Sequence, residues 1–295
     1  MFNRLTAPWM LAAAVLLQPL GAAAALLMPG ERQSFIYTDA GAFAGVPLTV
    51  HYYKPRTAGP EARVLFALHG SERNAQRARD NWIAFADQNN FIVLAPEFDL
   101  QRFPMPLYQL GGMEERDSER WTFSLIEGVF DRVKQEERLA APVYDMFGHS
   151  AGAQFVQRYV LMMANPRLGT AVAANAGSYT LPVYSGLFDH GYPYALDERR
   201  VGAEALKQAM RRRLVVLLGE QDTKTGKDVP HTRQAVAQGV NRFERGQNFF
   251  RQATEQAHRM GVDLQWQLST VPGVGHDSRK MSRAAGLLYV QERAR

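Results

Sequence analysis

Short, uninterrupted apolar runs recur along the chain, and stretches with helical spacing separate most of them. Such runs are typical of parallel strands that are covered by helices on both faces of a sheet. Strands that alternate with helices in this way predict βαβ units. The expected fold class is therefore α/β, with a mostly parallel, eight-stranded-type sheet flanked by helices. The predicted strands are residues 35–37, 47–53, 63–68, 91–95, 143–147, 170–176, 213–218 and 264–271.

Helices are expected where apolar residues recur every three or four positions. The predicted helices are residues 75–88, 121–137, 151–163, 231–260 and 284–291. Residues 99–120 and 179–204 lack such a period, and we expect two long loops there. No shift of composition marks a domain boundary, so residues 26–295 are predicted to form a single domain.

The first 25 residues have the three-part layout of a secretory signal peptide. Arg4 supplies a positive start, an apolar run covers residues 7–20, and Ala23 and Ala25 stand as in an A-x-A cleavage site. We therefore expect cleavage near Ala25 and a secreted or periplasmic protein with no stable membrane insertion. An uncleaved anchor is the alternative, but this run is shorter than the roughly 20 residues that a membrane-spanning helix needs.

Composition and missing motifs narrow the function classes. The chain has no cysteine, which excludes thiol catalysis and cysteine-ligated metal sites. It has neither an H-E-x-x-H motif nor a G-x-x-x-x-G-K-[ST] loop, so we expect no metal and no nucleotide cofactor. The formal charge of +5 is modest and the runs of Lys and Arg are short, so we expect no nucleic-acid partner.

The motif G-x-S-x-G occurs at Gly148–Gly152, between a predicted strand and a predicted helix. This is the strand–turn–helix setting of a nucleophile elbow, which would make Ser150 the nucleophile. Glycines permit the sharp turn, and the backbone N–H groups of a helix N-terminus favour developing negative charge. The alternative is an ordinary strand–helix turn in which Ser150 only caps the helix.

A serine nucleophile needs a base, and the base needs an orienting carboxylate. In enzymes with a nucleophile elbow the chain order is serine, acid, histidine. Asp222 lies in the acidic loop after the strand at 213–218, and His276 lies in the Gly-rich loop after the strand at 264–271. Glu220 is a second candidate for the acid, but the deeper loop position of Asp222 favours it.

An acyl-transfer site also needs two donors for the oxyanion. The first predicted donor is the backbone N–H of Ala151, which follows the nucleophile. The second is the N–H of Ser71, because the loop after the strand at 63–68 reads His69-Gly70-Ser71 and Gly70 allows a close approach. The alternative for this loop is a tight turn without a catalytic role.

These four motifs together resemble the polyhydroxybutyrate-depolymerase and feruloyl-esterase-like branch of the α/β-hydrolase superfamily. The resemblance covers about residues 60–290 and implies a serine hydrolase that cleaves carboxylic esters, with a small-molecule or polymeric ester as substrate. An amide hydrolase acting on an anionic polymer such as polyaspartate is the alternative. A non-catalytic member of the fold that only binds ligands is a third reading.

Substrate contacts are predicted at four positions near these loops, namely His69, Trp121, Asn175 and Tyr179. In this hypothesis, aromatic residues of the candidate pocket loops, in and beside the two long loops, form an apolar cleft over Ser150. They equally fit a purely structural role as loop anchors. These aromatic residues are Phe98, Phe103, Tyr108, Trp121, Tyr179, Tyr184, Phe188, Tyr192 and Tyr194.

Overall fold

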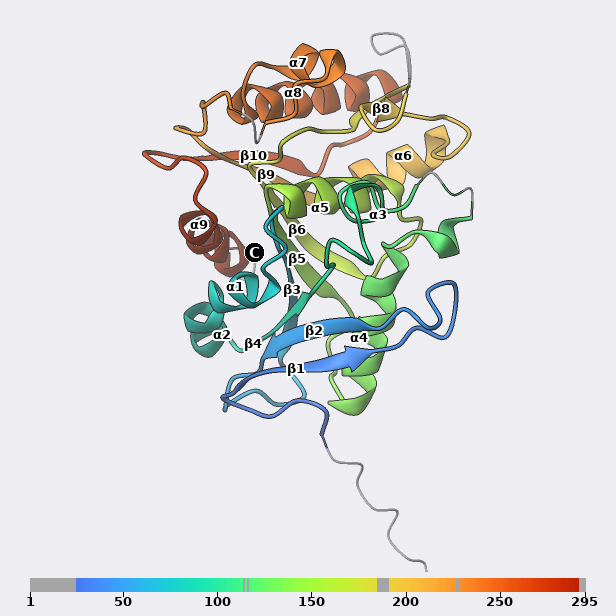
Figure 1. Cartoon of the computed structure of the whole chain (residues 1–295). Helices are drawn as coiled ribbons and strands as arrows, with labels where there is room; N and C mark the ends of the chain where they lie inside the picture. Colours follow the sequence, from blue (N-terminus) through green and yellow to red (C-terminus); the bar gives the residue numbers. More distant parts are fainter. Residues whose placement is uncertain (1–24, 114, 116, 185–190, 227–228, 292–295) are drawn as a thin grey trace, which may run out of the picture.

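A single eight-stranded sheet runs through the structure, a computed structural model that describes residues 25–113, 115, 117–184, 191–226 and 229–291 (Figure 1). Nearly all of the predicted signal peptide lies outside these residues. Within them, no helix has the length and apolar character needed to cross a membrane. The strands are β1 (Arg32–Tyr37), β2 (Leu48–Tyr53), β3 (Arg63–Leu68), β4 (Phe91–Pro96), β5 (Tyr144–His149), β6 (Leu168–Ala174), β9 (Arg213–Gly219) and β10 (Trp266–Val271).

The strand order in this sheet is β1-β2-β4-β3-β5-β6-β9-β10. The first two strands are antiparallel to each other, and β2 is antiparallel to β4. All pairings from β4 to β10 are parallel, so the carboxyl ends of these six strands meet at one edge of the sheet. The expected α/β class and mostly parallel sheet are therefore confirmed. Strand β5, which Ser150 directly follows, lies near the middle of the sheet.

Alternation along the strands divides the core into two layers. In β3, Val64, Phe66 and Leu68 belong to one core cluster, while Leu65 and Ala67 belong to the other. Period-two alternation of this kind is what a strand requires when both of its faces are covered. The burial of every residue from Val64 to Leu68 explains why the sequence reads as a continuous apolar run.

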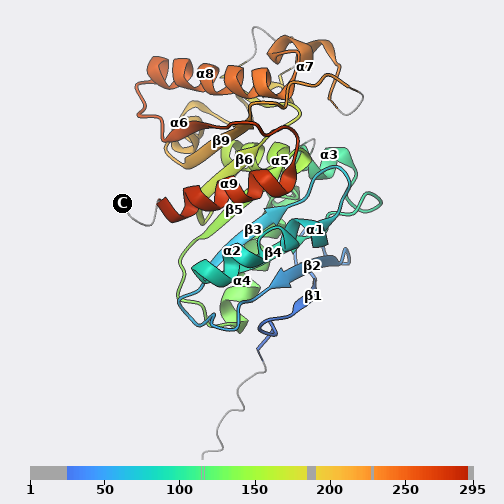
Figure 2. The same ribbon diagram turned by 90° about the vertical axis from the view of Figure 1, so that its left-hand side faces the viewer.

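Three helices cover the face of the sheet that appears on the left in Figure 1 and toward the viewer in Figure 2. Buried residues of this layer form one cluster with the strand residues of that face; they include Met281 and Tyr289 of α9, and Trp82 between α1 and α2. The Tyr289 hydroxyl also donates to the Met146 carbonyl at 2.8 Å, which ties the last helix to β5. The helices are α1 (Ala75–Asp80), α2 (Ile83–Asn89) and α9 (Ser278–Gln291).

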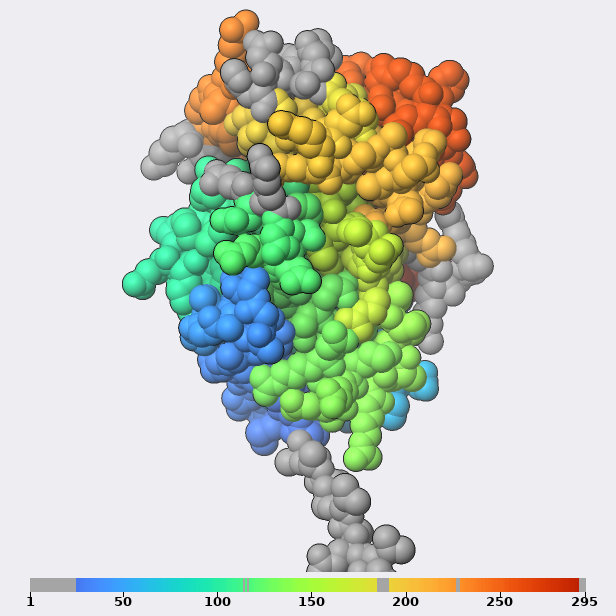
Figure 3. Space-filling model, turned by 90° about the vertical axis from the view of Figure 1, so that its right-hand side faces the viewer, coloured from blue at the N-terminus to red at the C-terminus, as the bar shows by residue number. Residues whose placement is uncertain are grey.

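The opposite face carries the remaining long helices, and Figure 3 shows this side with α4 in green and the segment around α6 in yellow. Helix α5 directly follows the nucleophile elbow, and all twelve of its residues are buried. The elements on this side are α3 (Met105–Tyr108), the 3-10 helix η1 (Ser118–Arg120), α4 (Ser124–Glu136), α5 (Ala151–Met162), α6 (Ala203–Met210), α7 (Arg233–Gln238) and α8 (Arg242–Met260).

Several predicted elements need correction. The single helix expected at 75–88 is two helices, because Trp82 turns inward and packs against Phe147 and Tyr289. The helix expected at 231–260 is interrupted at Gly239, whose φ of 149° is incompatible with a helix, and restarts at the Asn241 cap.

The loops expected at 99–120 and 179–204 also contain regular structure. The first holds α3 and η1. The second holds the start of α6 and a separate two-stranded sheet of β7 (Leu181–Tyr184) and β8 (Ala195–Leu196). The chain also begins α9 six residues earlier than expected.

Candidate active site

The elbow at Ser150 is a sharp backbone turn that depends on the glycines on either side of it. Ser150 itself has φ 58° and ψ −114°, a region that non-glycine residues rarely adopt. A Cβ added to Gly148 would lie 2.2 Å from the Gly152 carbonyl oxygen, and one added to Gly152 would lie 2.4 Å from that of Leu68. Both glycines therefore let β5, α5 and the end of β3 approach to backbone contact.

The elbow is fixed against its neighbours on both sides. The Ser150 N–H donates to the Ala174 carbonyl at the end of β6, at 3.0 Å. On the β3 side, a Cβ on Gly70 would lie 3.8 Å from the Ser150 Cβ, so the loop with Ser71 runs directly beside the nucleophile. The structure thus brings both predicted oxyanion donors, Ser71 and Ala151, to the neighbourhood of Ser150.

The predicted acid and the predicted base are joined by a short hydrogen bond. His276 Nδ1 lies 2.6 Å from Asp222 Oδ2, which fixes the ring so that its other nitrogen, Nε2, faces away from the carboxylate. Asp222 is only 2% exposed, and its second oxygen, Oδ1, lies 3.4 Å from Arg242 Nη1. Glu220 is placed differently: it is exposed and accepts a hydrogen bond from Thr270 Oγ1 at 2.8 Å.

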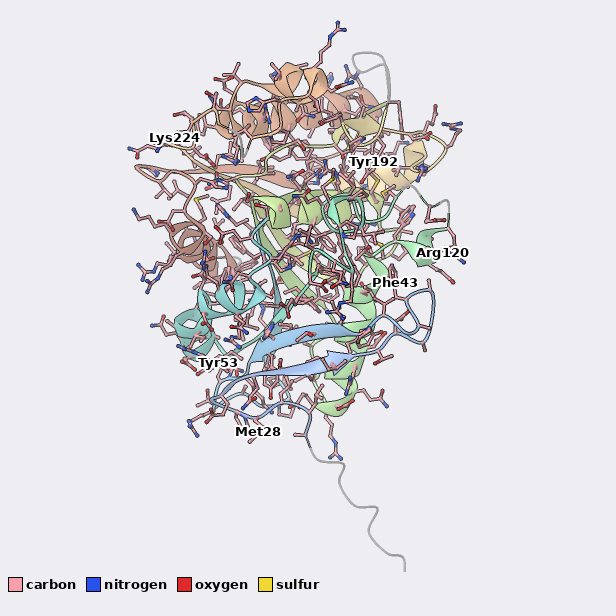
Figure 4. All side chains as sticks on the ribbon, in the orientation of Figure 1. Met28, Phe43, Tyr53, Arg120, Tyr192 and Lys224 are labelled. Carbon is pink, nitrogen blue, oxygen red and sulfur yellow. The ribbon has the colours of Figure 1, made fainter. Side chains whose placement is uncertain are left out.

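Ser150 and His276 open onto one cavity of about 750 Å³. It lies between the loop from β3 to α1 and the loop from β10 to α9, on the side that faces the viewer in Figure 2. Its lining includes His69 and Ser71 from the first loop. Three cationic side chains also line it, namely Arg77, Lys224 and Arg242. In Figure 4, Lys224 lies on the same side of the molecule as α1 and α9.

His69 acts as an internal brace of the oxyanion loop. Its Nε2 accepts the Phe98 N–H at 3.1 Å, so its Nδ1 carries the hydrogen that it donates to the Gly70 carbonyl at 3.0 Å. Burial lowers the pKa of His69 to about 4, which keeps the ring neutral at neutral pH. The Tyr108 hydroxyl donates to the His69 carbonyl at 2.6 Å. His69 therefore lines the cavity, but its hydrogen bonds to Gly70, Phe98 and Tyr108 hold the loop after β3 in shape.

A second neutral imidazole packs against the base. The His149 ring lies 4.4 Å from the His276 ring, centroid to centroid. Burial, and then the charges of His276 and Arg242, lower the pKa of His149 well below its usual value. A neutral ring at this position packs against His276 without adding a positive charge beside it.

The other predicted substrate contacts lie outside the cavity lining. Trp121 is buried in the large core cluster, and Tyr179 is fully buried and stacks on Phe249. The buried side chain of Asn175 contacts the loops of the acid and the base. Their burial gives all three a packing or positioning role in this structure, because a ligand in the described cavity does not reach them.

The described aromatic residues in and beside the long loops do not line the cavity at Ser150. Phe98 stacks on Tyr108 and meets Phe103 edge to face. Trp121 and Tyr179 are also buried, whereas the three tyrosines at 184, 192 and 194 are half-buried and pack against the large core cluster. This packing fits the hypothesis that these residues anchor the loops. Phe188 lies outside the described residues.

Sequence reasoning missed Arg242. It follows the Asn241 cap at the start of α8, and the side chain reaches the buried Asp222 from there. An Asn cap before a helix is visible in sequence, but nothing in the sequence shows which loop the first helical residue touches. In the described part of the chain, no group of three or more His, Cys, Asp or Glu side chains is arranged to hold a metal ion.

Comparison with known proteins gave relatives of the same architecture. No protein-family model matches the chain. The structure of poly(aspartic acid) hydrolase-1 from Sphingomonas sp. KT-1 is similar with a TM-score of 0.84 and 38% identity, covering 89% of this chain and 99% of that one. LpqC, a poly(3-hydroxybutyrate) depolymerase from Bordetella parapertussis, gives 0.82 and 31%, covering 89% and 90%.

A curated relative supports the same grouping over a shorter stretch. The bifunctional acetylxylan esterase/xylanase XynS20E of Neocallimastix patriciarum is 24% identical over 123 residues, which is 41% of this chain. The match spans only 17% of the length of that relative. Fold, elbow and the two nearly full-length matches agree. The chain therefore belongs to the α/β-hydrolase superfamily, in the branch that includes poly(3-hydroxybutyrate) depolymerase and poly(aspartic acid) hydrolase, and it is a hydrolase.

Proposed function

We propose that the protein is a serine hydrolase that cleaves carboxylic ester bonds, including those of a polyester or an acylated polymer, through an acyl-Ser150 intermediate. The observation that carries this proposal is the Asp222–His276 hydrogen bond of 2.6 Å at the wall of the cavity that Ser150 also lines. A serine on a strained elbow, beside a histidine oriented by a buried carboxylate, is the arrangement that activates a hydroxyl for acyl transfer.

The proposed mechanism has two half-reactions, acylation and deacylation, and His276 acts first as base and then as acid in each. His276 Nε2 takes the proton of Ser150 as its oxygen forms a bond to the substrate carbonyl carbon, and the N–H groups of Ser71 and Ala151 stabilise the oxyanion. His276 then gives that proton to the leaving alkoxide as the ester bond breaks. Water, deprotonated by the same nitrogen, then attacks the acyl carbon, and His276 gives that proton to the Ser150 oxygen as its bond to the acyl group breaks and the acid leaves.

The decisive experiment joins a substrate screen to Ser150→Ala. Short and long acyl esters should be hydrolysed, and a fluorophosphonate should label Ser150. The alanine variant should lose several orders of magnitude in kcat while its circular dichroism spectrum stays that of the parent, because the removed hydroxyl forms the covalent intermediate. Full activity of this variant, or labelling at another residue, contradicts the proposal. A folded protein that binds esters without turnover would instead be a non-catalytic member of the fold.

A second candidate is an amide hydrolase that acts on an anionic polymer. Three observations favour it: Arg77, Lys224 and Arg242 line the cavity, the chain has a formal charge of +5, and the poly(aspartic acid) hydrolase relative is 38% identical. Cationic walls attract polyanions and raise their local concentration, and salt screens that attraction.

The two candidates differ in bond preference and in salt dependence. With matched small substrates, the ester hydrolase should cleave the ester faster than the amide, because an alkoxide leaves more readily than an amine. For polyaspartate, kcat/KM should fall as salt is added, whereas for a neutral polyester it should stay nearly constant. Flat salt dependence together with no cleavage of polyaspartate removes the second candidate.

We further propose that the protein is exported, secreted or periplasmic, with residues 1–25 removed. The three-part layout of that segment supports the proposal. The chain just after the cleavage point is anchored to the fold, since the Leu27 N–H donates to Glu137 Oε1 at 2.7 Å and Leu27 is buried.

A further inference from the structure

The two residues at the carboxyl end of β6 touch all three parts of the catalytic machinery. Asn175, directly after the strand, is fully buried and has φ 52°. Its Oδ1 accepts the Gly219 N–H at 2.8 Å, and its Nδ2 donates to the Gly275 carbonyl at 3.2 Å. Gly219 begins the loop that ends in Asp222, and Gly275 precedes His276, so one amide group joins the loop of the acid to the loop of the base.

These two loops lie against each other at the point where Asn175 joins them. The Gln221 N–H donates to the Val274 carbonyl at 2.8 Å. A Cβ on Gly219 would lie 2.5 Å from the Val274 carbonyl oxygen and 2.8 Å from that of Gly275. The contact at Gly219 is therefore backbone against backbone, and a side chain at this position would push the two loops apart.

The nucleophile is tied to the same place. The Ser150 N–H donates to the carbonyl of Ala174, the residue before Asn175, at 3.0 Å. The Asn175 N–H in turn donates to the Leu217 carbonyl of β9 at 3.1 Å. Two consecutive residues at the end of β6 thus make all of these contacts. The carbonyl of Ala174 binds the elbow, and the side-chain amide of Asn175 binds the loops of the acid and the base.

We propose that Asn175 is a positioning residue that sets the distance between the Asp222–His276 pair and Ser150. This inference rests on the proposed serine hydrolase function. The site needs a side chain that accepts from one loop and donates to the other, and an amide has both groups while a carboxylate lacks the donor. Asparagine also tolerates the left-handed backbone at this position better than most residues.

The test compares Asn175→Gly with the isosteric Asn175→Asp. Glycine accepts φ 52° without strain and removes both hydrogen bonds, whereas aspartate keeps the acceptor for Gly219 and places an oxygen against the Gly275 carbonyl. Misplacement of catalytic groups by about 1 Å costs on the order of 100-fold in rate, so we expect each variant to lose about 10- to 100-fold in kcat on p-nitrophenyl acetate. KM should change less than about threefold, because Asn175 does not line the cavity.

Asn90→Gly is the matched control. Asn90 has the same left-handed conformation, with φ 58°, but it directly precedes β4. It therefore lies at the amino ends of the parallel strands, away from the site at their carboxyl ends. Its replacement should leave kcat and KM at their parental values. Thermal unfolding of each variant shows which fraction of the protein is folded. Each rate is divided by the number of sites that a fluorophosphonate labels. Should the glycine variant not fold, the aspartate variant carries the test.

A double-mutant cycle separates positioning from general destabilisation. If Asn175 acts through Asp222 and His276, Asn175→Gly should cost less than about twofold when Asp222→Asn is already present, because residues that act as a unit are not additive. Parental kcat in both folded single variants, or an equal loss with and without Asp222→Asn, overturns the inference. A parent protein that neither reacts with the fluorophosphonate nor cleaves esters is a different result, because it overturns the proposed function itself.

Discussion

At the scale of single residues, the carboxylate of Asp222 uses both of its oxygens. Oδ2 contacts His276 and Oδ1 contacts Arg242, and both partners approach a side chain that is almost fully buried. Glu220 has the same charge and stands two positions earlier, yet its carboxylate is exposed and bound to Thr270. The loop therefore separates a buried carboxylate that contacts the proposed base, His276, from an exposed carboxylate whose hydrogen-bond partner is Thr270.

This difference predicts unequal effects of two isosteric changes. Asp222→Asn should lower kcat by roughly 10³- to 10⁴-fold, because an amide cannot hold His276 in the tautomer that accepts the serine proton. Glu220→Gln should change kcat less than about threefold, within the effect of an exposed substitution. Steady-state kinetics of both variants on one ester measures the difference. A larger loss at Glu220 would make it the acid.

The neutral His69 ring predicts that stability falls in acid. Its pKa is about 4 in the folded protein and 6.5 by default, so between these values the unfolded chain binds a proton that the folded one does not. His69 should thus contribute about 3 kcal/mol to the free energy of unfolding above pH 6.5, and this contribution should be lost as the pH drops to 4. His149, whose pKa is also lowered, acts in the same direction. Urea unfolding between pH 7 and 4 measures this slope.

His69→Gln tests the origin of that slope. Glutamine keeps an acceptor for the Phe98 N–H but does not titrate, so its stability should depend less on pH over the same range. His258→Gln on the exposed side of α8 is the control and should keep the parental slope. An unchanged slope in the His69 variant would show that His69 has the same pKa in the folded and the unfolded protein, and would contradict the prediction.

At the scale of elements, all eight strands of the main sheet were predictable, while several helix limits were not. A strand buried on both faces is uniformly apolar, so it can be recognised from its own sequence without knowing which strands lie beside it. The break between α1 and α2 depends on Trp82 packing against α9, which lies some 200 residues further along the chain. The pairing of β7 with β8 likewise depends on tertiary contacts, because β8 has only two residues.

The elbow predicts a sharp stability difference between two glycines. In Gly152→Ala the new Cβ would meet the backbone of Leu68 at 2.4 Å and of His69 at 2.8 Å, and backbone cannot yield as a flexible side chain does. Unfolding free energy should fall by at least about 2 kcal/mol. Gly59→Ala, whose Cβ would meet nothing within 4 Å, should stay within about 1 kcal/mol of the parent. Denaturant unfolding of both variants measures this, and equal stabilities would contradict the crowding.

At the scale of the whole molecule, the sequence motifs of the elbow, acid loop and base loop lie together because parallel strands end at one edge of the sheet. Each of Ser150, Asp222 and His276 follows a predicted parallel strand in the sequence, which is why the three residues were recognisable as candidates. Arg242 was not, and the substrate contacts predicted at Trp121 and Tyr179 were placed by their loop positions only. Which aromatic residues turn inward is decided by packing between distant segments.

The proposed export predicts a specific mature chain. Intact mass of the protein from the secreted or periplasmic fraction should correspond to a chain that begins near Leu26. The fold should be retained, because the contacts of Leu27 and the bridge between Pro29 and Lys54 lie after the cut. Protein that carries Met1 and stays in the cytosol would contradict the proposal.

The position of β10 at the edge of the sheet has a consequence for biosynthesis. Among the described strands β10 pairs only with β9, and the loop that follows β10 carries His276. A ribosome-bound chain that has already folded β1 to β9 contains the serine and the carboxylate but no base between them. The proposed triad is therefore assembled only after β10 has joined the sheet, and a chain that stops before His276 lacks the proposed base.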